Sequence, residues 1–219
     1  MQDIYLLVSG PLAWAAWAIF LFGSIYKIWK TLDTAKKKEQ VLFSYVSLKY
    51  GLRSIINWSI PFNTVNMRLN PALTAISFFF HIAFFVLLLF VSAHQVMLGE
   101  GFGISWFTIP DTLANILAFG VLGACIFFAA RRLTVPEVKY VTDWTDFALL
   151  ILVVAPFVTG ILAYYQIGNY MLMIILHMLF AEAVLVAIPF TRLSHMLLAP
   201  LTRAYIGSEF GMVRNVKDW

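Results

Sequence analysis

Five long apolar segments, separated by polar ones, dominate the pattern of residues along the chain. A helix needs about 20 apolar residues to cross the hydrocarbon core of a bilayer, and each segment approaches or exceeds that length. A soluble helix would instead place polar residues regularly along one face. The pattern predicts an all-α membrane protein, a single domain over residues 1–219 built as a five-transmembrane-helix bundle. The predicted spans are Ile4–Tyr26, 72–97, Thr112–Ala130, Phe147–Tyr165 and Tyr170–Leu198.

Prolines add detail to these spans. Pro71 suits the first turn of the second span, because the backbone N–H that proline lacks has no helical partner there. Pro156 and Pro189 lie inside the fourth and fifth spans, where proline removes a backbone hydrogen bond and kinks a helix. The residues before the first span include Asp3 and neither Lys nor Arg, so we do not expect a cleavable signal peptide.

The basic residues all lie on one side of the predicted bundle. All 15 Lys and Arg residues fall in 27–70, in 131–146 or from residue 192 onward, which five spans place on the same side. The opposite segments contain only Asp3, Glu100 and Asp111 as charged residues. Positive loops stay in the cytoplasm. We therefore expect a multi-pass protein of the cell inner membrane, with its N-terminus outside and its C-terminus in the cytoplasm.

Composition changes this interpretation little. The chain is 62% hydrophobic and 12% charged, whereas soluble domains average roughly one half and one quarter. The net charge of +4 is explained by membrane topology, with lipid and not nucleic acid as the expected partner. Cys125 is the one cysteine, so no internal disulfide forms. The sequence has no glycine-rich phosphate loop, CxxC motif or catalytic triad, which leaves open whether the chain is itself an enzyme.

The four histidines are the main candidates for chemistry. His81 and His94 fall in the second span, and His177 and His195 in the fifth. An ionisable residue within a membrane span is costly, so it indicates a function. Imidazole is a common metal ligand, and facing helices of a bundle hold b-type haem with one histidine each. The structural alternative is a hydrogen bond between helices.

The histidine spacing supports this interpretation in part. His177 and His195 are 18 residues apart, which is five turns of a continuous helix, so both face one side about 27 Å apart. His81 and His94 are 13 residues apart, about 220° around a straight helix. The second pair therefore shares a face only if the helix is kinked or bulged, and neither Pro nor Gly lies between them.

Three motifs carry a resemblance: FFHIA at 79–83, RRLTVPEV at 131–138 and PFTRLSHMLLAPL at 189–201. They are similar to motifs of the cytochrome b, or gamma, subunit of respiratory nitrate reductase and its relatives. The resemblance implies a dihaem subunit with two haem b groups, one held by His81 and His195 near the cytoplasm and one by His94 and His177 nearer the outside. It also implies electron exchange between quinol and a cytoplasmic iron–sulfur partner.

The chain departs from the nitrate reductase pattern in three ways. The gap between the second-span histidines is longer, the lysine of that family's quinol pocket has no counterpart in IPDTLANILAFG at 109–120, and the connection at 166–169 is shorter. Short versions resemble the cytochrome b subunits that accompany heterodisulfide-reductase-like iron–sulfur proteins in complexes of sulfate reducers. That branch implies menaquinol or an external multihaem cytochrome c as the electron source.

Several roles stay open at this stage. Near-equal depth in antiparallel helices also allows a single haem between His81 and His177. Glu182 is a candidate proton or quinone site, or forms an interhelical hydrogen bond. Arg192 either pairs with a haem propionate or anchors the span at the interface. A different class of function is a haem-free membrane anchor or a proton-coupled transporter subunit.

The cytoplasmic segment 27–70 is the longest polar stretch. Its apolar and basic residues alternate loosely from Thr31 onward, as in an amphipathic helix at a membrane surface. It is either the docking site of the iron–sulfur subunit or a lipid anchor.

The charge distribution makes a direct prediction about topology. A reporter enzyme fused after Trp219 should be active only in the cytoplasm, and an epitope inserted in 98–111 should be reached by antibody from outside, because every cationic residue lies on the other side. A C-terminus accessible from outside would contradict the five-span arrangement.

Overall fold

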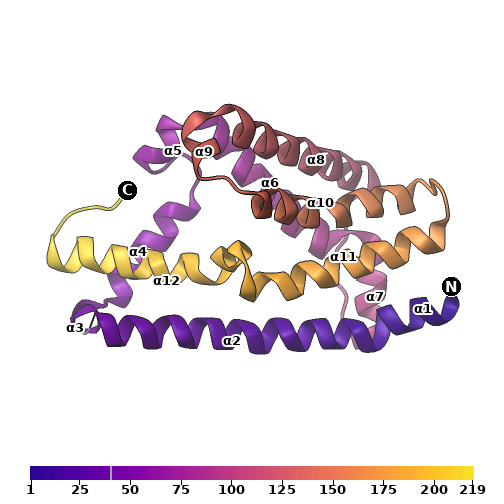
Figure 1. Ribbon diagram of the computed structural model, residues 1–219, viewed down its shortest axis with the longest axis horizontal. Helices are drawn as coiled ribbons and strands as arrows, with labels where there is room; N and C mark the ends of the chain where they lie inside the picture. Colours follow the sequence, from indigo (N-terminus) through magenta and orange to yellow (C-terminus); the bar gives the residue numbers. More distant parts are fainter. Residues whose placement is uncertain (40) are drawn as a thin grey trace. The chain divides into compact units, whose positions relative to one another are not determined.

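The computed structural model describes residues 1–39 and 41–219, and all the regular structure in them is helical (Figure 1). Five helices are long and apolar enough to cross a membrane: Gln2–Lys38, Pro71–Phe90, Asp111–Thr134, Trp144–Tyr164 and Tyr170–Phe190. For the described residues, the all-α prediction is confirmed, and so is the prediction of five helices long and apolar enough to span a membrane. The elements are α1 Gln2–Leu7, η1 Val8–Leu12, α2 Ala13–Lys38, α3 Leu42–Tyr45, α4 Leu48–Ser59, α5 Val65–Leu69, α6 Pro71–Phe90, α7 Ser92–Phe102, α8 Asp111–Thr134, α9 Pro136–Tyr140, α10 Trp144–Tyr164, α11 Tyr170–Phe190, η2 Arg192–Ser194, α12 His195–Ser208 and η3 Glu209–Val213.

The first helix is longer than its apolar part. It continues to Lys38, twelve residues past the predicted end at Tyr26, so the polar segment starts as helix. The extension contains neither Gly nor Pro, and Lys37 pairs with Asp33 one turn earlier at 2.6 Å. Lysines in its last turn also compensate the negative end of the helix dipole.

The second and fifth spans are both interrupted, where the sequence predicted continuous helices over 72–97 and 170–198. The second breaks at Val91, whose backbone is extended with ψ 136°. The fifth ends at Phe190, one residue after Pro189, and Thr191 begins the next turn by accepting a hydrogen bond from Leu193 N at 3.2 Å. By contrast, α10 continues through Pro156.

The chain divides into two compact units. The first comprises Met1–Ser9 and Ala75–Ala181, and the second Gly10–Thr74 and Glu182–Trp219. In the first unit, α8 and α10 pack against each other (Figure 1). Its core joins α6, α8 and α10 through apolar side chains, which include Ala83, Leu87, Val121, Cys125, Leu150, Val154 and Phe157.

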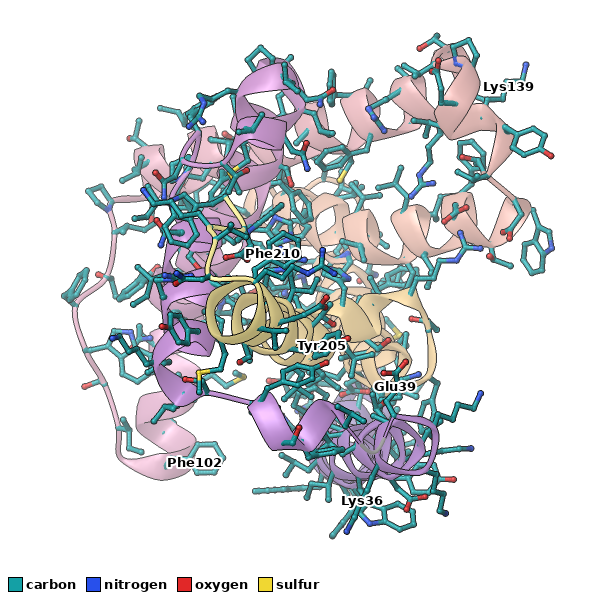
Figure 2. The ribbon with its side chains drawn as sticks, turned by 90° about the vertical axis from the view of Figure 1, so that its left-hand side faces the viewer. Lys36, Glu39, Phe102, Lys139, Tyr205 and Phe210 are labelled. Atoms are coloured by element: carbon teal, nitrogen blue, oxygen red, sulfur yellow. The ribbon has the colours of Figure 1, made fainter. Side chains whose placement is uncertain are left out.

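The second unit is organised around a close contact between α4 and α12. Small residues allow it, because Gly51 lies against Ala204, and Gly207 against Ser54 and the carbonyl of Tyr50. The Ser208 hydroxyl accepts a hydrogen bond from Ser47 N at 3.0 Å, so the contact also satisfies polar groups. Tyr205 on α12 and Phe210 on the turn that follows are labelled in Figure 2.

The last residues of the chain fold back on α4 within this unit. The carboxylate of Asp218, 2% exposed, accepts a hydrogen bond from the Ser54 hydroxyl at 2.5 Å and lies 4.0 Å from Arg203 Nη1. Trp58 Nε1 donates to the Asp218 carbonyl at 3.2 Å. The Arg203 guanidinium also lies 4.2 Å from the centre of the Trp58 ring, so α4, α12 and the tail share one polar cluster.

Tyrosines join α3 to α12 in the same unit. The rings of Tyr45 and Tyr205 have centroids 6.3 Å apart. A hydrogen bond with Tyr45, together with burial, raises the pKa of Tyr205 to about 12. The two tyrosines therefore connect α3 to α12 through both ring packing and a hydrogen bond.

The tight α4–α12 contact predicts the effect of one methyl group. Gly207→Ala should lower the free energy of unfolding by about 1–3 kcal/mol, because its Cβ would overlap Ser54 and lie 2.6 Å from the Tyr50 carbonyl oxygen. Gly101→Ala is the control, since no atom lies within 4 Å of its added Cβ. Thermal unfolding in detergent measures both, and equal melting temperatures would contradict the contact.

Candidate functional site

All four histidines have the same hydrogen-bonding arrangement, although they lie on four different helices. In each ring Nδ1 is within hydrogen-bonding distance of a backbone carbonyl oxygen. Because a carbonyl only accepts, Nδ1 carries the proton, and the lone pair of the neutral ring lies on Nε2. Metal-binding histidines typically have this arrangement, with the second nitrogen fixed by a carbonyl. The pairs are His81 with Ser77 at 2.7 Å, His94 with Leu87 at 3.1 Å and Leu88 at 3.0 Å, His177 with Pro156 at 2.8 Å, and His195 with Arg192 at 3.0 Å.

His94 and His177 lie together in the first unit. Their ring centroids are 6.0 Å apart and their planes differ by 21°. A first-row metal ion lies about 2 Å from an imidazole nitrogen, so two axial ligands of one iron have ring centres about 6 Å apart. The separation also falls within the range of aromatic pairs. The placement of the lone pairs on Nε2 makes the ligand interpretation the more specific of the two.

The position of His177 depends on α10. Its Nδ1 donates to the carbonyl of Pro156, which also accepts from the Thr159 hydroxyl at 3.1 Å. Gly160 follows one turn after Pro156, and a Cβ there would lie 3.1 Å from His177 Nδ1 and 3.2 Å from Cε1. Gly160 therefore leaves the space that the His177 ring occupies. From the sequence, Pro156 was expected only to kink its span and Gly160 was not singled out, although a glycine one turn after a proline within a span is a visible signal.

The position of His94 depends on the break between α6 and α7. The extended backbone at Val91 ends α6, and α7 then starts a new helix axis on which His94 is the third residue. The imidazole folds back onto the open end of α6 and donates to the carbonyls of Leu87 and Leu88. The break is the kink that the 13-residue spacing required, without Pro or Gly to signal it.

The calculation of histidine faces for continuous helices is therefore wrong for both spans. The 220° between His81 and His94 assumed a straight helix, but the axis changes at Val91. The five turns between His177 and His195 assumed one helix, but α11 ends at Phe190 and His195 begins α12. His81 belongs to the first unit and His195 to the second, so their pairing stays a prediction.

Glu182 and Arg192 both lie in the second unit. The Glu182 side chain is on α11 and 9% exposed, and within the described residues no hydrogen-bond partner reaches its Oε2. Arg192 is exposed at the start of η2, and its carbonyl accepts the hydrogen bond from His195. The backbone of Arg192 thus orients a candidate ligand, which is a different role from the propionate contact predicted for its side chain.

The donor set restricts which metal group fits. Across residues 1–39 and 41–219, no group of three or more His, Cys, Asp or Glu side chains could hold a metal ion. Pairs of imidazoles alone would leave a bare ion with few ligands. Haem supplies its own four equatorial nitrogens and needs only axial ligands, so the histidine pair fits it.

The helices and the histidines together describe an all-helical protein with five potential membrane spans and a histidine pair within its first unit. A protein of Nitratidesulfovibrio vulgaris is 31% identical to the chain over 215 residues, covering 96% of this chain and 95% of the relative. The chain belongs to the same family as that protein, whose name, "Protein", states no activity. No protein-family model matches the chain, and no solved structure matches it.

The space at Gly160 generates a prediction for the site. Gly160→Ala should push the His177 ring off the Pro156 carbonyl and lower the free energy of unfolding by about 1–3 kcal/mol. Gly123→Ala is the matched control, because Gly123 lies in α8 with no atom within 4 Å of an added Cβ. Thermal unfolding in detergent compares the two, and an effect of equal size in both would show that His177 does not need this space.

Proposed function

We propose that the chain is a dihaem cytochrome b subunit of a respiratory redox complex, which carries electrons across the membrane. The observation that carries this proposal is the arrangement shared by all four histidines, with Nδ1 on a backbone carbonyl and the lone pair on Nε2. The motifs at 79–83 and 189–201 support the same assignment. Bound haem supplies one-electron redox chemistry. The protein supplies the ligands, their orientation and an apolar surrounding.

In this proposal His94 and His177 hold one haem, and His81 and His195 hold the other. The 6.0 Å between the ring centroids of His94 and His177 supports the first pair. A single haem between His81 and His177 is the alternative. The Pro156 carbonyl and the tight fit over Gly160 hold the His177 ring where it lies beside His94, which favours the first pairing.

The chain's own residues control how the ligands are oriented. The carbonyl of Leu88 keeps His94 in one tautomer, and the carbonyl of Pro156 does the same for His177. A fixed tautomer lowers the cost of binding, because the imidazole does not have to reorient. The apolar core beside α6, which includes Ala83 and Leu87, keeps water away from this part of the unit. Arg192 is the candidate partner for a haem propionate.

The distribution of charge supports an orientation with the N-terminus outside, the C-terminus in the cytoplasm and the cell inner membrane as location. The cytoplasmic partner is an iron–sulfur subunit of heterodisulfide-reductase type, which docks on the segment 27–70. On α4 the side chains of Leu48, Leu52 and Ile56 are exposed opposite the α12 contact, which offers an apolar surface next to Lys49. Membrane lipid is the alternative occupant of that surface.

Electrons enter on the outer side, from menaquinol or from an external multihaem cytochrome c. Quinol oxidation releases protons, so it requires an acceptor. Glu182 is a candidate, because its buried Oε2 has no partner in the described part of the chain. Apart from this possible quinol chemistry, the chain has no catalytic motif of its own, and it serves as the electron-transfer subunit of an oxidoreductase complex.

A second candidate function is a haem-free anchor or a proton-coupled transporter subunit. The buried Glu182 carboxyl favours it, since an intramembrane acid with an unpaired oxygen suits proton binding as well. The two functions differ in one measurable property. A cytochrome b has a visible α-band that appears on reduction, and a haem-free protein has none.

The ligand assignment predicts the spectra of histidine variants. The purified protein should contain two haem b groups per chain. His94→Ala and His177→Ala should each lose the same haem, and His81→Ala and His195→Ala the other, because an axial ligand is removed in each case. Reduced-minus-oxidised spectra and the haem-to-protein ratio measure the loss.

Double variants provide the control. His94→Ala with His177→Ala should lose no more haem than either alone, whereas His81→Ala with His94→Ala should lose both groups. Full haem content in any single variant would remove that histidine from the ligand set.

A further inference from the structure

Gln95 is a buried polar residue whose side-chain amide forms hydrogen bonds through both its nitrogen and its oxygen. It follows His94 on α7 and is 4% exposed. Its Nε2 donates to the Leu89 carbonyl at 2.5 Å, and its Oε1 accepts from Trp106 N at 3.0 Å. One side chain therefore joins the end of α6, the start of α7 and the loop before α8.

The break at Val91 explains why such a residue is needed. In a continuous helix the carbonyls of the last turn of α6 would accept from amides four residues later. At the break they accept from elsewhere: Leu87 and Leu88 from the His94 ring, Leu89 from Gln95 and Trp106, and Phe90 from Ile109 N. Unpaired carbonyls are costly in a membrane, so these donors hold the break in place.

Among these donors, Gln95 is the one that also influences the orientation of the adjacent residue, His94. Trp106 Nε1 also reaches the Leu89 carbonyl at 2.8 Å, but the indole lies on the loop and is 39% exposed. Gln95 is directly bonded to His94 through the backbone, and its own N–H donates to the Val91 carbonyl at 3.1 Å. Its amide thus fixes the rotation of the first turn of α7, and with it the direction of the His94 ring.

We propose that Gln95 is the positioning residue of His94. It holds the start of α7 so that His94 Nδ1 stays on the carbonyls of Leu87 and Leu88 and the ring stays beside that of His177. The inference rests on the proposed function in that His94 is taken as a haem ligand. Its structural part, the orientation of the His94 ring, can be measured separately.

The test replaces the amide with a side chain of equal length that forms no hydrogen bonds. Gln95→Met should release haem from the His94–His177 pair about 10-fold faster. The reason is that loss of a residue that supports a ligand typically lowers metal affinity by 10–100-fold. Transfer of haem to an excess of apo-globin is followed optically in the purified full chain, with one kinetic phase per haem. The second phase, from the other pair, should keep its wild-type rate.

Val96→Met is the matched control, because it introduces the same side chain at the next position, where the side chain is 58% exposed. Its two phases should equal those of the wild type. Gln95→Asn is a smaller, polar variant that does not span both partners, and it should accelerate the same phase if Gln95→Met fails to fold. Unchanged release in the Gln95 variants, or equal acceleration of both phases, would overturn the proposal.

A second readout separates this inference from the proposed function. If the wild-type protein contains no haem, the cytochrome assignment fails, and modification of His94 by diethylpyrocarbonate then tests its orientation by mass spectrometry. His94 should react several-fold faster in Gln95→Met than in Val96→Met. Equal rates would show that Gln95 does not position the ring.

Discussion

A backbone carbonyl in a membrane has no water to bond, so it must find a donor within the protein, and the first unit of this structure depends on that constraint. It is most evident where α6 ends at Val91. Four carbonyls in the last turn of α6 accept from donors outside that helix, and side chains of α7 and of the loop before α8 supply most of them. A break that would be prohibitive for exposed backbone is thereby stabilised, and it changes the direction of the chain between two histidines of one span.

The same constraint links the stability of the helices to the chemistry of the imidazoles. A histidine that donates from Nδ1 to a carbonyl satisfies that carbonyl and at the same time fixes its own tautomer. His177 does this for Pro156, within a helix where proline already disturbs the hydrogen-bonding pattern, and His195 does it for Arg192 at the start of α12. Each ring thus donates from Nδ1 to a backbone carbonyl and keeps its lone pair on Nε2. Replacing a histidine in this chain therefore removes a structural donor as well as a candidate ligand.

The sequence predicted the features that depend on composition and missed those that depend on specific contacts. Long apolar runs require helices in lipid, so five spans followed from hydropathy alone. The end of α11 was partly foreseeable from Pro189, but the break at Val91 was not, because VSAHQ contains neither of the helix breakers Gly and Pro. The donors from His94, Gln95, Trp106 and Ile109 make that break favourable, and they become visible only with the structure. Gly160 was missed for a related reason, since its importance lies in the space it leaves for a ring on another helix.

The geometry of the first unit also bears on how the four histidines would be paired in the proposed dihaem protein. His177 is held by three features that all belong to this unit: the Pro156 carbonyl, the space over Gly160 and the neighbouring ring of His94. These features favour His94 over His81 as the neighbour of His177. His81 and His195 each donate from Nδ1 to a carbonyl of their own unit, Ser77 and Arg192. Their pairing rests on the motifs at 79–83 and 189–201 and stays part of the proposal, because the contacts within each unit orient each ring without joining the two.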